Sequence, residues 1–370
     1  MKFVRIGTRL GIGPIIAILT LGLVVRNSAA AGKSTGFVYV ATNAAANSVI
    51  QYVRAADGSL TMNAEVLTGG SGTGATAVDP LGSQDSLVTS ADGSLLVVVN
   101  AASNEVTSLR AGSGGLQVAS TVSSNGTFPN SVAIRGDLVY VVNAQSTPNV
   151  TAFRVDASGA LTAIPDSTRN LPGGGSAAPH DVVFSPDGTR LLVSEGGTNQ
   201  IDVFQLDDNG LATVVTTSPS AGSGPFGMRF GRNGALIVVE AATASASSYV
   251  LTPRNTLTVV SAAVANGQAA SCWISLAPDG KFGFVSDTGS GVFSSYQVSG
   301  NGMLNLASAV AASAGGGAPI DSSITGDGAF MYVVDSSKGR VLAYGIHGAS
   351  LHPAEVVTGL PLSVQGIVAQ

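Results

Sequence analysis

Four titratable side chains depart from an otherwise regular pattern of small and apolar residues. They are His180, Glu195, Arg229 and Glu240. Imidazole and carboxylate groups are the usual proton carriers in catalysis, and a guanidinium binds carboxylates and oxyanions. The counterparts of Arg229 in similar segments are uncharged, namely Val183, Ser275 and Ser323. If the chain has a catalytic site, these departures are where the sequence places it.

A repeated sequence pattern predicts the β-strands that position these four side chains. An apolar strand ends in Asn or an acid, and a turn and a second apolar strand follow. Seven copies occur, ending at Asn43, Asn100, Asn143, Glu195, Glu240, Asp287 and Asp335, with spacings of 57, 43, 52, 45, 47 and 48 residues. Turn phrases such as Ser185-Pro186-Asp187-Gly188 and Asp57-Gly58-Ser59 separate further strands, and Asp-Gly suits two-residue hairpin turns. Each unit therefore reads as a four-stranded meander, A-B-C-D.

This repeat predicts an all-β fold, a seven-bladed β-propeller of four-stranded antiparallel blades spanning residues 36–370. The first copy begins at strand B and lacks a strand A. The apolar segment 362–369 follows the last blade and can supply that strand. The C-terminal strand is expected to join the first blade and close the ring, which removes open sheet edges.

Aligning the strands predicts two rings of residues. Strand A contributes, near the mouth of the central channel, Asp85, Asn130, His180, Phe226, Cys272 and Ile320. The ends of strand B form the other ring, where Asn and Asp can bond the following turn as structural residues. Glu195 and Glu240 fit that local role less well, and Glu240 is the expected ion-pair partner of Arg229. Asn130, Asp85, Glu195 and Asp287 are candidate substrate-binding residues.

The longest connections are those between strands D and A, including residues 69–84. Variable loops on a rigid scaffold usually carry binding, so the face bearing the D–A and B–C loops is the expected functional face.

Residues 1–31 have the features of an export signal. Lys2, Arg5 and Arg9 precede an apolar run that is short for a membrane span, and small residues follow. A cleaved signal peptide predicts a secreted or periplasmic protein. Because Arg26 lies between the apolar run and the small residues, an uncleaved membrane anchor is the alternative.

Composition excludes several functions. Residues 1–31 hold four of the 17 basic residues and no acid, so the remainder has 13 basic against 22 acidic residues. This acidic balance argues against a nucleic-acid partner. Cys272 is the only cysteine, so no intramolecular disulfide forms. No motif indicates a cofactor or metal site.

The phrases Tyr140-Val141-Val142-Asn143, Pro179 to Gly188 and Asp57 to Thr61 resemble those of the lactonase-type seven-bladed propellers. That group includes 6-phosphogluconolactonase-like proteins, carboxymuconate cyclases and YVTN repeat proteins. In the carboxymuconate-cyclase branch a His, an Arg and a Glu carry the site. The resemblance implies His180 or Glu240 as general acid/base and Arg229 as the group binding a carboxylate or oxyanion.

Two functions follow. The first is an exported hydrolase or cyclase acting on a lactone of an unphosphorylated sugar acid or small carboxylic acid, because phosphorylated lactones belong to the cytosol. The second is a non-catalytic propeller whose loop face binds an envelope or extracellular partner.

Overall fold

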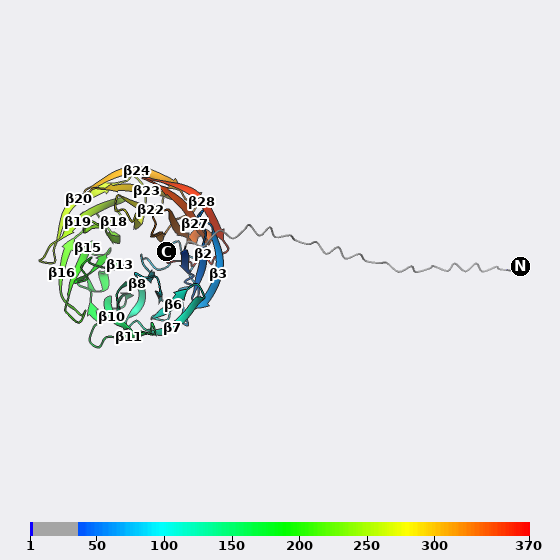
Figure 1. Ribbon diagram of the computed structural model, residues 1–370, viewed down its shortest axis with the longest axis horizontal. Helices are drawn as coiled ribbons and strands as arrows, with labels where there is room; N and C mark the ends of the chain where they lie inside the picture. Colours follow the sequence, from blue (N-terminus) through cyan, green and yellow to red (C-terminus); the bar gives the residue numbers. More distant parts are fainter. Residues whose placement is uncertain (3–35) are drawn as a thin grey trace. The chain divides into compact units, whose positions relative to one another are not determined.

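Seven antiparallel sheets, six of four strands and one of five, form the ring of a β-propeller in the computed structural model (Figure 1). The structure describes residues 1–2 and 36–370. The predicted signal segment, apart from residues 1 and 2, lies outside the described residues. No helix in the part of the chain that the structure describes is long and apolar enough to span a membrane.

Each blade runs from an inner strand A to an outer strand D, as predicted (Figure 1). From blade 1 to blade 7, strand A is β29 (Ile367–Ala369), β4 (Leu87–Thr89), β8 (Thr127–Arg135), β13 (Pro179–Phe184), β17 (Pro225–Phe230), β21 (Ser271–Leu276) and β25 (Ser322–Ile324). Strand B is β1 (Gly36–Ala41), β5 (Leu95–Asn100), β9 (Leu138–Gln145), β14 (Arg190–Glu195), β18 (Ala235–Glu240), β22 (Phe282–Asp287) and β26 (Phe330–Asp335).

Strand C is β2 (Ser48–Arg54), β6 (Glu105–Gly112), β10 (Asn149–Val155), β15 (Gln200–Leu206), β19 (Ser245–Leu251), β23 (Val292–Val298) and β27 (Arg340–His347). Strand D is β3 (Leu60–Leu67), β7 (Gly115–Ser123), β11 (Leu161–Ala163), β16 (Ala212–Pro219), β20 (Leu257–Ala265), β24 (Leu304–Ser313) and β28 (Ser350–Thr358). Blade 3 departs from the pattern, because a further short strand, β12 (Arg169–Asn170), also pairs with β10. Two 3₁₀ turns, Gly174–Ser176 and Ser336–Lys338, complete the described elements.

The ring closes through the C-terminal strand, which confirms the prediction. β29 pairs with β1 in the register Val38↔Ala369 and Val40↔Ile367. The strand is shorter than expected, because the residues from Leu362 to Gly366 are not extended into the sheet.

The A–B turns differ in detail from the predicted two-residue hairpins. In blade 2 the Gly93 N–H donates to the Ser90 carbonyl at 2.8 Å, and Gly93 has φ 73° while Asp92 keeps negative φ. The Asp92 carboxylate instead accepts from the Ser90 hydroxyl at 2.6 Å and the Ser94 N–H at 3.1 Å. The Asp therefore closes the turn with its side chain, and only the Gly supplies the left-handed conformation.

Strand B is the most buried part of each blade. β5 and β18 are buried along their whole length. Clusters of apolar side chains fill the space between neighbouring blades. Tyrosines from strand B add polar links across these clusters: the Tyr332 hydroxyl of blade 7 donates to the Gly58 carbonyl of blade 1 at 2.7 Å. The rigid wall formed in this way fixes the inner strands that surround the channel.

Candidate functional site

The aligned position of strand A coincides with a β-bulge in four blades. The pairing of strands A and B shifts register at Asn130 in β8, at His180 in β13, at Phe226 and Gly227 in β17, and at Cys272 in β21. A bulge bends its strand and re-aims the side chains beside it. The sequence alignment thus found a position with a distinct backbone conformation at the loop-bearing end of the channel.

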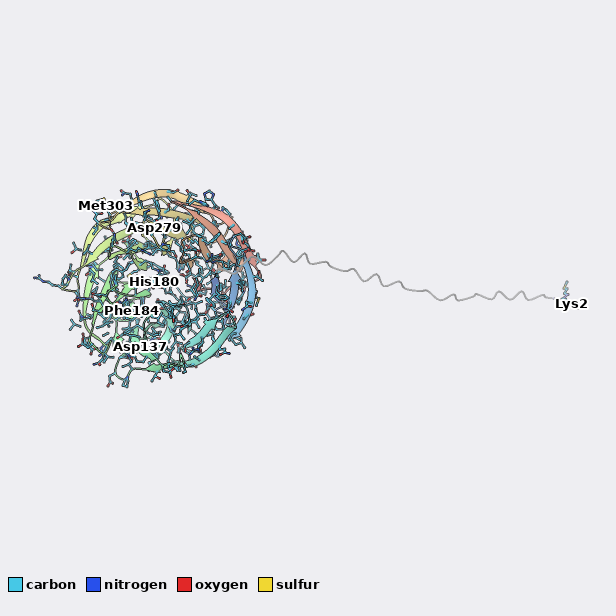
Figure 2. The ribbon with its side chains drawn as sticks, in the orientation of Figure 1. Lys2, Asp137, His180, Phe184, Asp279 and Met303 are labelled. Carbon is cyan, nitrogen blue, oxygen red and sulfur yellow. The ribbon has the colours of Figure 1, made fainter. Side chains whose placement is uncertain are left out.

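His180 lies at this end of the channel, near the centre of the ring (Figure 2). Its Nδ1 is 2.6 Å from the Gly82 carbonyl, so Nδ1 carries the proton and Nε2 is left as an acceptor. The imidazole stacks on Phe226, with ring centroids 4.2 Å apart and an interplanar angle of 17°. Burial lowers the pKa of His180, which favours the neutral ring. This is the protonation state that a general base needs.

The residues that hold His180 also close the channel mouth. The segment Asp79–Gln84, which we term the plug, crosses the mouth and bonds to the inner strands of several blades. The Ser83 carbonyl accepts from Trp273 Nε1 and from Gln365 Nε2, both at 2.8 Å, and the Ser83 hydroxyl donates to the Asn130 carbonyl at 2.6 Å. The Ser83 and Gln84 side chains are buried. The channel mouth on the D–A and B–C loop face is therefore filled by the protein's own chain.

Gln84 is the last residue of the plug, and its side chain extends into the channel. Its Oε1 accepts from the Ile274 N–H at 2.8 Å, and its Nε2 donates to Asp181 Oδ2 at 3.3 Å and to the Met228 carbonyl at 3.4 Å. One buried amide thus links blades 2, 4, 5 and 6. It separates the His180 layer from the charged groups below.

Arg229 belongs to that lower layer and pairs with Asp85. Its Nη1 and Nη2 donate to the two Asp85 oxygens at 2.7 and 2.6 Å, and its Nη1 also lies 3.7 Å from Asp181 Oδ2. The expected pair with Glu240 does not form. In the register of β17 and β18, Arg229 lies opposite Ile237 and Glu240 lies opposite Pro225, so the two side chains occupy different ends of the blade.

His180 and Arg229 are also in different layers. His180 stacks on Phe226, and Arg229 follows Phe226 by three residues along β17. Three residues of extended strand span roughly 10 Å. The structure therefore brings Asp85 and Arg229 together, and it places His180 and Glu240 elsewhere.

Two buried acids in the channel, Asp181 and Asp321, escaped the sequence analysis. Burial raises the pKa of both carboxyls well above the usual range, the Asp85 charge raises it further, and Arg229 opposes the shift. Asp181 accepts the Met228 N–H at 2.7 Å, whereas Asp321 Oδ2 has no partner among the described residues. Asp181 and Asp321 each come one residue after the aligned strand-A position. The sequence signal that could have found them is that the other blades carry no acid there, but Ser86, Ser131, Gly227, Trp273 and Gly366.

The acids of the strand-B ring are fully buried and hold loops in place. Glu195 accepts from the Gly173 N–H at 3.0 Å, Glu240 from the Gly222 N–H at 3.2 Å and the Ser245 hydroxyl at 2.8 Å, and Asp287 from Asn266 Nδ2 at 2.8 Å. Gly173, Gly222 and Asn266 all lie in D–A loops, which precede strand A of the same blade. The acids also bond to the following turn, because the Thr198 hydroxyl donates to Glu195 at 2.5 Å and the Ser337 hydroxyl to Asp335 at 2.6 Å. They therefore join the preceding loop to that turn. Asn130 is likewise occupied, because its Nδ2 donates to the Pro179 carbonyl at 2.8 Å.

A cavity of about 320 Å³, which we term the channel cavity, contains the Asp85–Arg229 pair. It is lined by residues of strand A in blades 2 to 5, and its charged members are Asp85, Arg135 and Arg229. Thr89, Arg135, Phe184 and Phe230 also line it, and each is the last residue of its strand. The cavity therefore lies toward the A–B turns, on the face opposite the plug.

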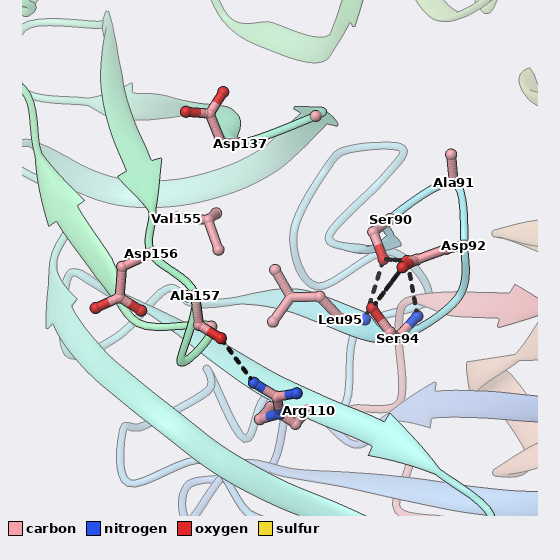
Figure 3. A pocket seen from close by; sticks show the side chains of 12 residues that line it. Ser90, Ala91, Asp92, Ser94, Leu95, Arg110, Asp137, Val155, Asp156 and Ala157 are labelled. Atoms are coloured by element: carbon pink, nitrogen blue, oxygen red, sulfur yellow. Dashed lines mark hydrogen bonds between the residues drawn. The ribbon is translucent and has the colours of Figure 1, made fainter.

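A second cavity of about 480 Å³ lies between the turns of blades 2 and 3 (Figure 3). Its Asp92 is held by Ser90 and Ser94, and its Arg110 donates to the Ala157 carbonyl at 3.1 Å (Figure 3). Both cavities therefore contain an arginine with donors to spare. The second cavity lies among turns, whereas the channel cavity places its arginine beside the Asp85 carboxylate at the inner strands.

Comparison with known proteins agrees with this architecture. The family model described as "Lactonase, 7-bladed beta-propeller" matches residues 30–170 and 172–369. The chain belongs to this lactonase family. No curated protein matches the sequence.

Several solved structures share the fold. A putative 6-phosphogluconolactonase from Bacteroides uniformis is 19% identical, with 89% of this chain and 99% of that chain covered and a TM-score of 0.70. The periplasmic gluconolactonase of Pseudomonas aeruginosa is 18% identical, with 89% and 98% covered and a TM-score of 0.70. A Lactobacillus plantarum protein is 19% identical, with 90% and 99% covered and a TM-score of 0.73.

Among residues 1–2 and 36–370, no three His, Cys, Asp or Glu side chains are grouped so that they could hold a metal ion. Burial raises the pKa of the Cys272 thiol far above its usual value, so this cysteine is not an activated nucleophile.

Proposed function

We propose that this chain hydrolyses a lactone of an unphosphorylated sugar acid or small carboxylic acid in the channel cavity. Family membership supports the reaction class. The observation that carries the proposal is the placement of Arg229 in a cavity of about 320 Å³, close to the lower limit of about 300 Å³ for ligand pockets. A small cyclic ester matches that size.

The hydrogen bonds of Arg229 leave it able to bind a substrate. Both Nη1 protons are used, by Asp85 and the Met228 carbonyl, and one Nη2 proton is used by Asp85. The Nε–H and the second Nη2–H have no partner among the described residues. A guanidinium has five such donors, so two remain for the carbonyl oxygen of a lactone.

The proposed reaction needs only water and these two side chains. Arg229 polarises the lactone carbonyl, and water adds to the carbonyl carbon as Asp85 takes one of its protons. Arg229 stabilises the negative charge on the former carbonyl oxygen. The bond to the ring oxygen then breaks, that oxygen receives the proton from Asp85, and a hydroxy acid leaves.

An unphosphorylated substrate fits the cations of the site. Arg135 and Arg229 are the only cationic side chains among the lining residues, and Asp85 already neutralises Arg229. A phosphate group carries a charge of about −1.5 to −2 at pH 7, and Arg135 offers a single positive charge against it. Export to the periplasm or the medium, expected from residues 1–31, favours the same choice.

The roles first expected for His180 and Glu240 remain part of the proposal to be tested. His180 supports a base role through its free Nε2 and lowered pKa. Glu240 is fully buried, and burial raises its pKa, so we expect it to act on stability rather than on the reacting atoms.

Turnover of a panel of sugar-acid lactones by pH-stat titration tests the proposal. We expect Asp85→Asn and Arg229→Gln each to lower kcat/KM by about 10²-fold or more, the usual effect of losing a proton-transfer or oxyanion group. Glu240→Gln should retain kcat/KM in the fraction that remains folded. If His180→Ala abolishes turnover while Asp85→Asn does not, the site is at the plugged mouth.

A non-catalytic binding propeller is the second candidate. The plug supports it, because it fills the mouth of the channel on the D–A and B–C loop face, where an envelope or extracellular partner would bind. Wild-type protein that turns over no lactone of the panel would favour this function.

A further inference from the structure

The plug determines from which side a ligand reaches the channel. Its Gln84 N–H donates to the His180 carbonyl at 2.9 Å, its Leu81 N–H donates to Gln365 Oε1 at 2.9 Å, and its Asp79 accepts from Gln365 Nε2 at 2.9 Å. Together with the Ser83 bonds to Asn130 and Trp273, these contacts fix the segment on four other blades. Entry from the loop face through the plug would break these bonds.

The other end of the channel carries an unmatched cation. Arg135 is the last residue of β8, is exposed, and lines the rim of the channel cavity. It has no hydrogen bond or ion pair among the described residues. Its acidic neighbours in space and sequence are matched to other arginines: Asp137 pairs with Arg154 at 2.8 Å and Asp187 with Arg190 at 3.4 Å.

The Arg135 side chain lies close to a neighbouring blade. It lies against the A–B turn of blade 4, where Gly188 has φ 75° and where an added Cβ would come within 2.1 Å of Arg135 Nε. A side chain at position 188 would make the Arg135 side chain move. The Arg135 side chain thus lies between the rim of the channel cavity and the neighbouring blade.

Arg135 is the charged residue of the channel cavity whose charge no neighbouring acid neutralises. Asp85 and Arg229 neutralise each other through a bidentate pair. Asp181 lies behind this pair and is fully buried. A rim with one free guanidinium above a neutral pair attracts a single carboxylate.

We infer that the channel cavity takes its substrate from the A–B turn face, and that the substrate bears a carboxylate besides its lactone group. Arg135 binds that carboxylate at the rim, and the lactone carbonyl lies deeper, at Arg229. The inference rests on the proposed function for the position of the carbonyl. It adds the route of entry and the class of substrate, an anionic lactone derived from a dicarboxylic acid.

Calorimetric titration with galactarate and succinate, two stable dicarboxylates, tests the binding site without any turnover. Galactitol, in which both carboxylates of galactarate are alcohols, is the neutral control ligand. We expect Arg135→Gln to weaken dicarboxylate binding about ten- to a hundredfold, the range for a charged hydrogen bond. Arg232→Gln is the matched control variant, because Arg232 lies in the A–B turn of blade 5 but does not line the channel cavity.

Three results would overturn the inference. Dicarboxylates that bind wild-type protein no better than galactitol would exclude an anion site. Equal affinities of Arg135→Gln and wild type would exclude Arg135, and loss of binding in His180→Ala with retention in Arg135→Gln would place entry at the loop face. Failure of the proposed hydrolysis is distinguishable, because absent lactone turnover leaves the dicarboxylate binding and its dependence on Arg135 unchanged.

Discussion

Replacing Arg229 by Met should destabilise the propeller through the acids left behind rather than through the lost side chain. The substitution keeps an unbranched apolar chain but removes the guanidinium that bonds Asp85 at 2.6 and 2.7 Å and faces Asp181 at 3.7 Å. Adding Asp85→Asn removes one of the two carboxyl groups, Asp85 and Asp181, that have lost their arginine. Asparagine tolerates the left-handed φ of 62° at this position, so the double variant introduces little backbone strain.

The expected size follows from the burial of the pair. Breaking a buried ion pair by removing one partner costs about 3–5 kcal/mol. The Arg229 side chain is 26% exposed and that of Asp85 is 17% exposed, so we expect a value near the lower limit, about 3 kcal/mol. The double variant should recover about half of that loss or more.

The pH dependence gives the prediction its sign. Arg229 opposes the raised pKa of Asp181, so its removal raises that pKa further and the folded state keeps a proton that the unfolded state releases. A raised carboxyl pKa makes stability fall as the pH rises, by at most about 1.4 kcal/mol per pH unit for each such proton. The cost of Arg229→Met should therefore be greater at pH 8 than at pH 5.

Urea unfolding of wild type, Arg229→Met and Arg229→Met/Asp85→Asn at the two pH values measures these differences. The reasoning is refuted if the single and double variants are equally stable at pH 8. It is also refuted if the loss in Arg229→Met is the same at both pH values, because a pH-independent loss would indicate packing alone.

Three further predictions concern other buried polar groups, each measured by urea unfolding. Tyr332→Phe should cost about 1 kcal/mol, since it removes the inter-blade bond to the Gly58 carbonyl; no measurable change would mean that this bond contributes nothing. Gln84→Met should cost about 1–3 kcal/mol, because the buried Ile274 N–H loses its acceptor, and a neutral result would contradict the plug's role. Burial, with Glu195 next, raises the pKa of Asp202 to about 8, so wild-type stability should fall from pH 4 to 8, and less steeply in Asp202→Asn; identical slopes would disprove it.

The fold was predictable because the same pattern of strands and turns occurs seven times in the sequence. Strand order, blade count and the closing role of the C-terminal segment all follow from one phrase and its missing first strand. The aligned strand-A position was also predictable, and it proved to be the bulged residue in four blades. Repetition makes the outlying residues visible even when their contacts are unknown.

The contacts themselves were not predictable, since they join segments that no periodicity relates. Asp85 and Arg229 come from blades 2 and 5, and Gln84 reaches residues of blades 4, 5 and 6. The plug is part of an irregular D–A loop, so no repeated pattern predicts its course across the mouth. Glu240 looked like a partner for Arg229 because both residues lie in blade 5. In the pairing of β17 with β18, however, Arg229 lies opposite Ile237, three residues along β18 from Glu240, so the two side chains do not meet.

The pairing of β1 with β29 has a consequence for how the chain acquires its structure. Val38 and Ala369 are register partners separated by almost the entire domain. Closing a loop of that length costs about 5 kcal/mol of chain entropy, by the logarithmic dependence on loop length. Six blades can form from local meanders, whereas the first blade stays one strand short until the last residues arrive. We therefore expect ring closure to be the slow, final step of folding, and the order of synthesis to decide when the protein becomes resistant to proteolysis.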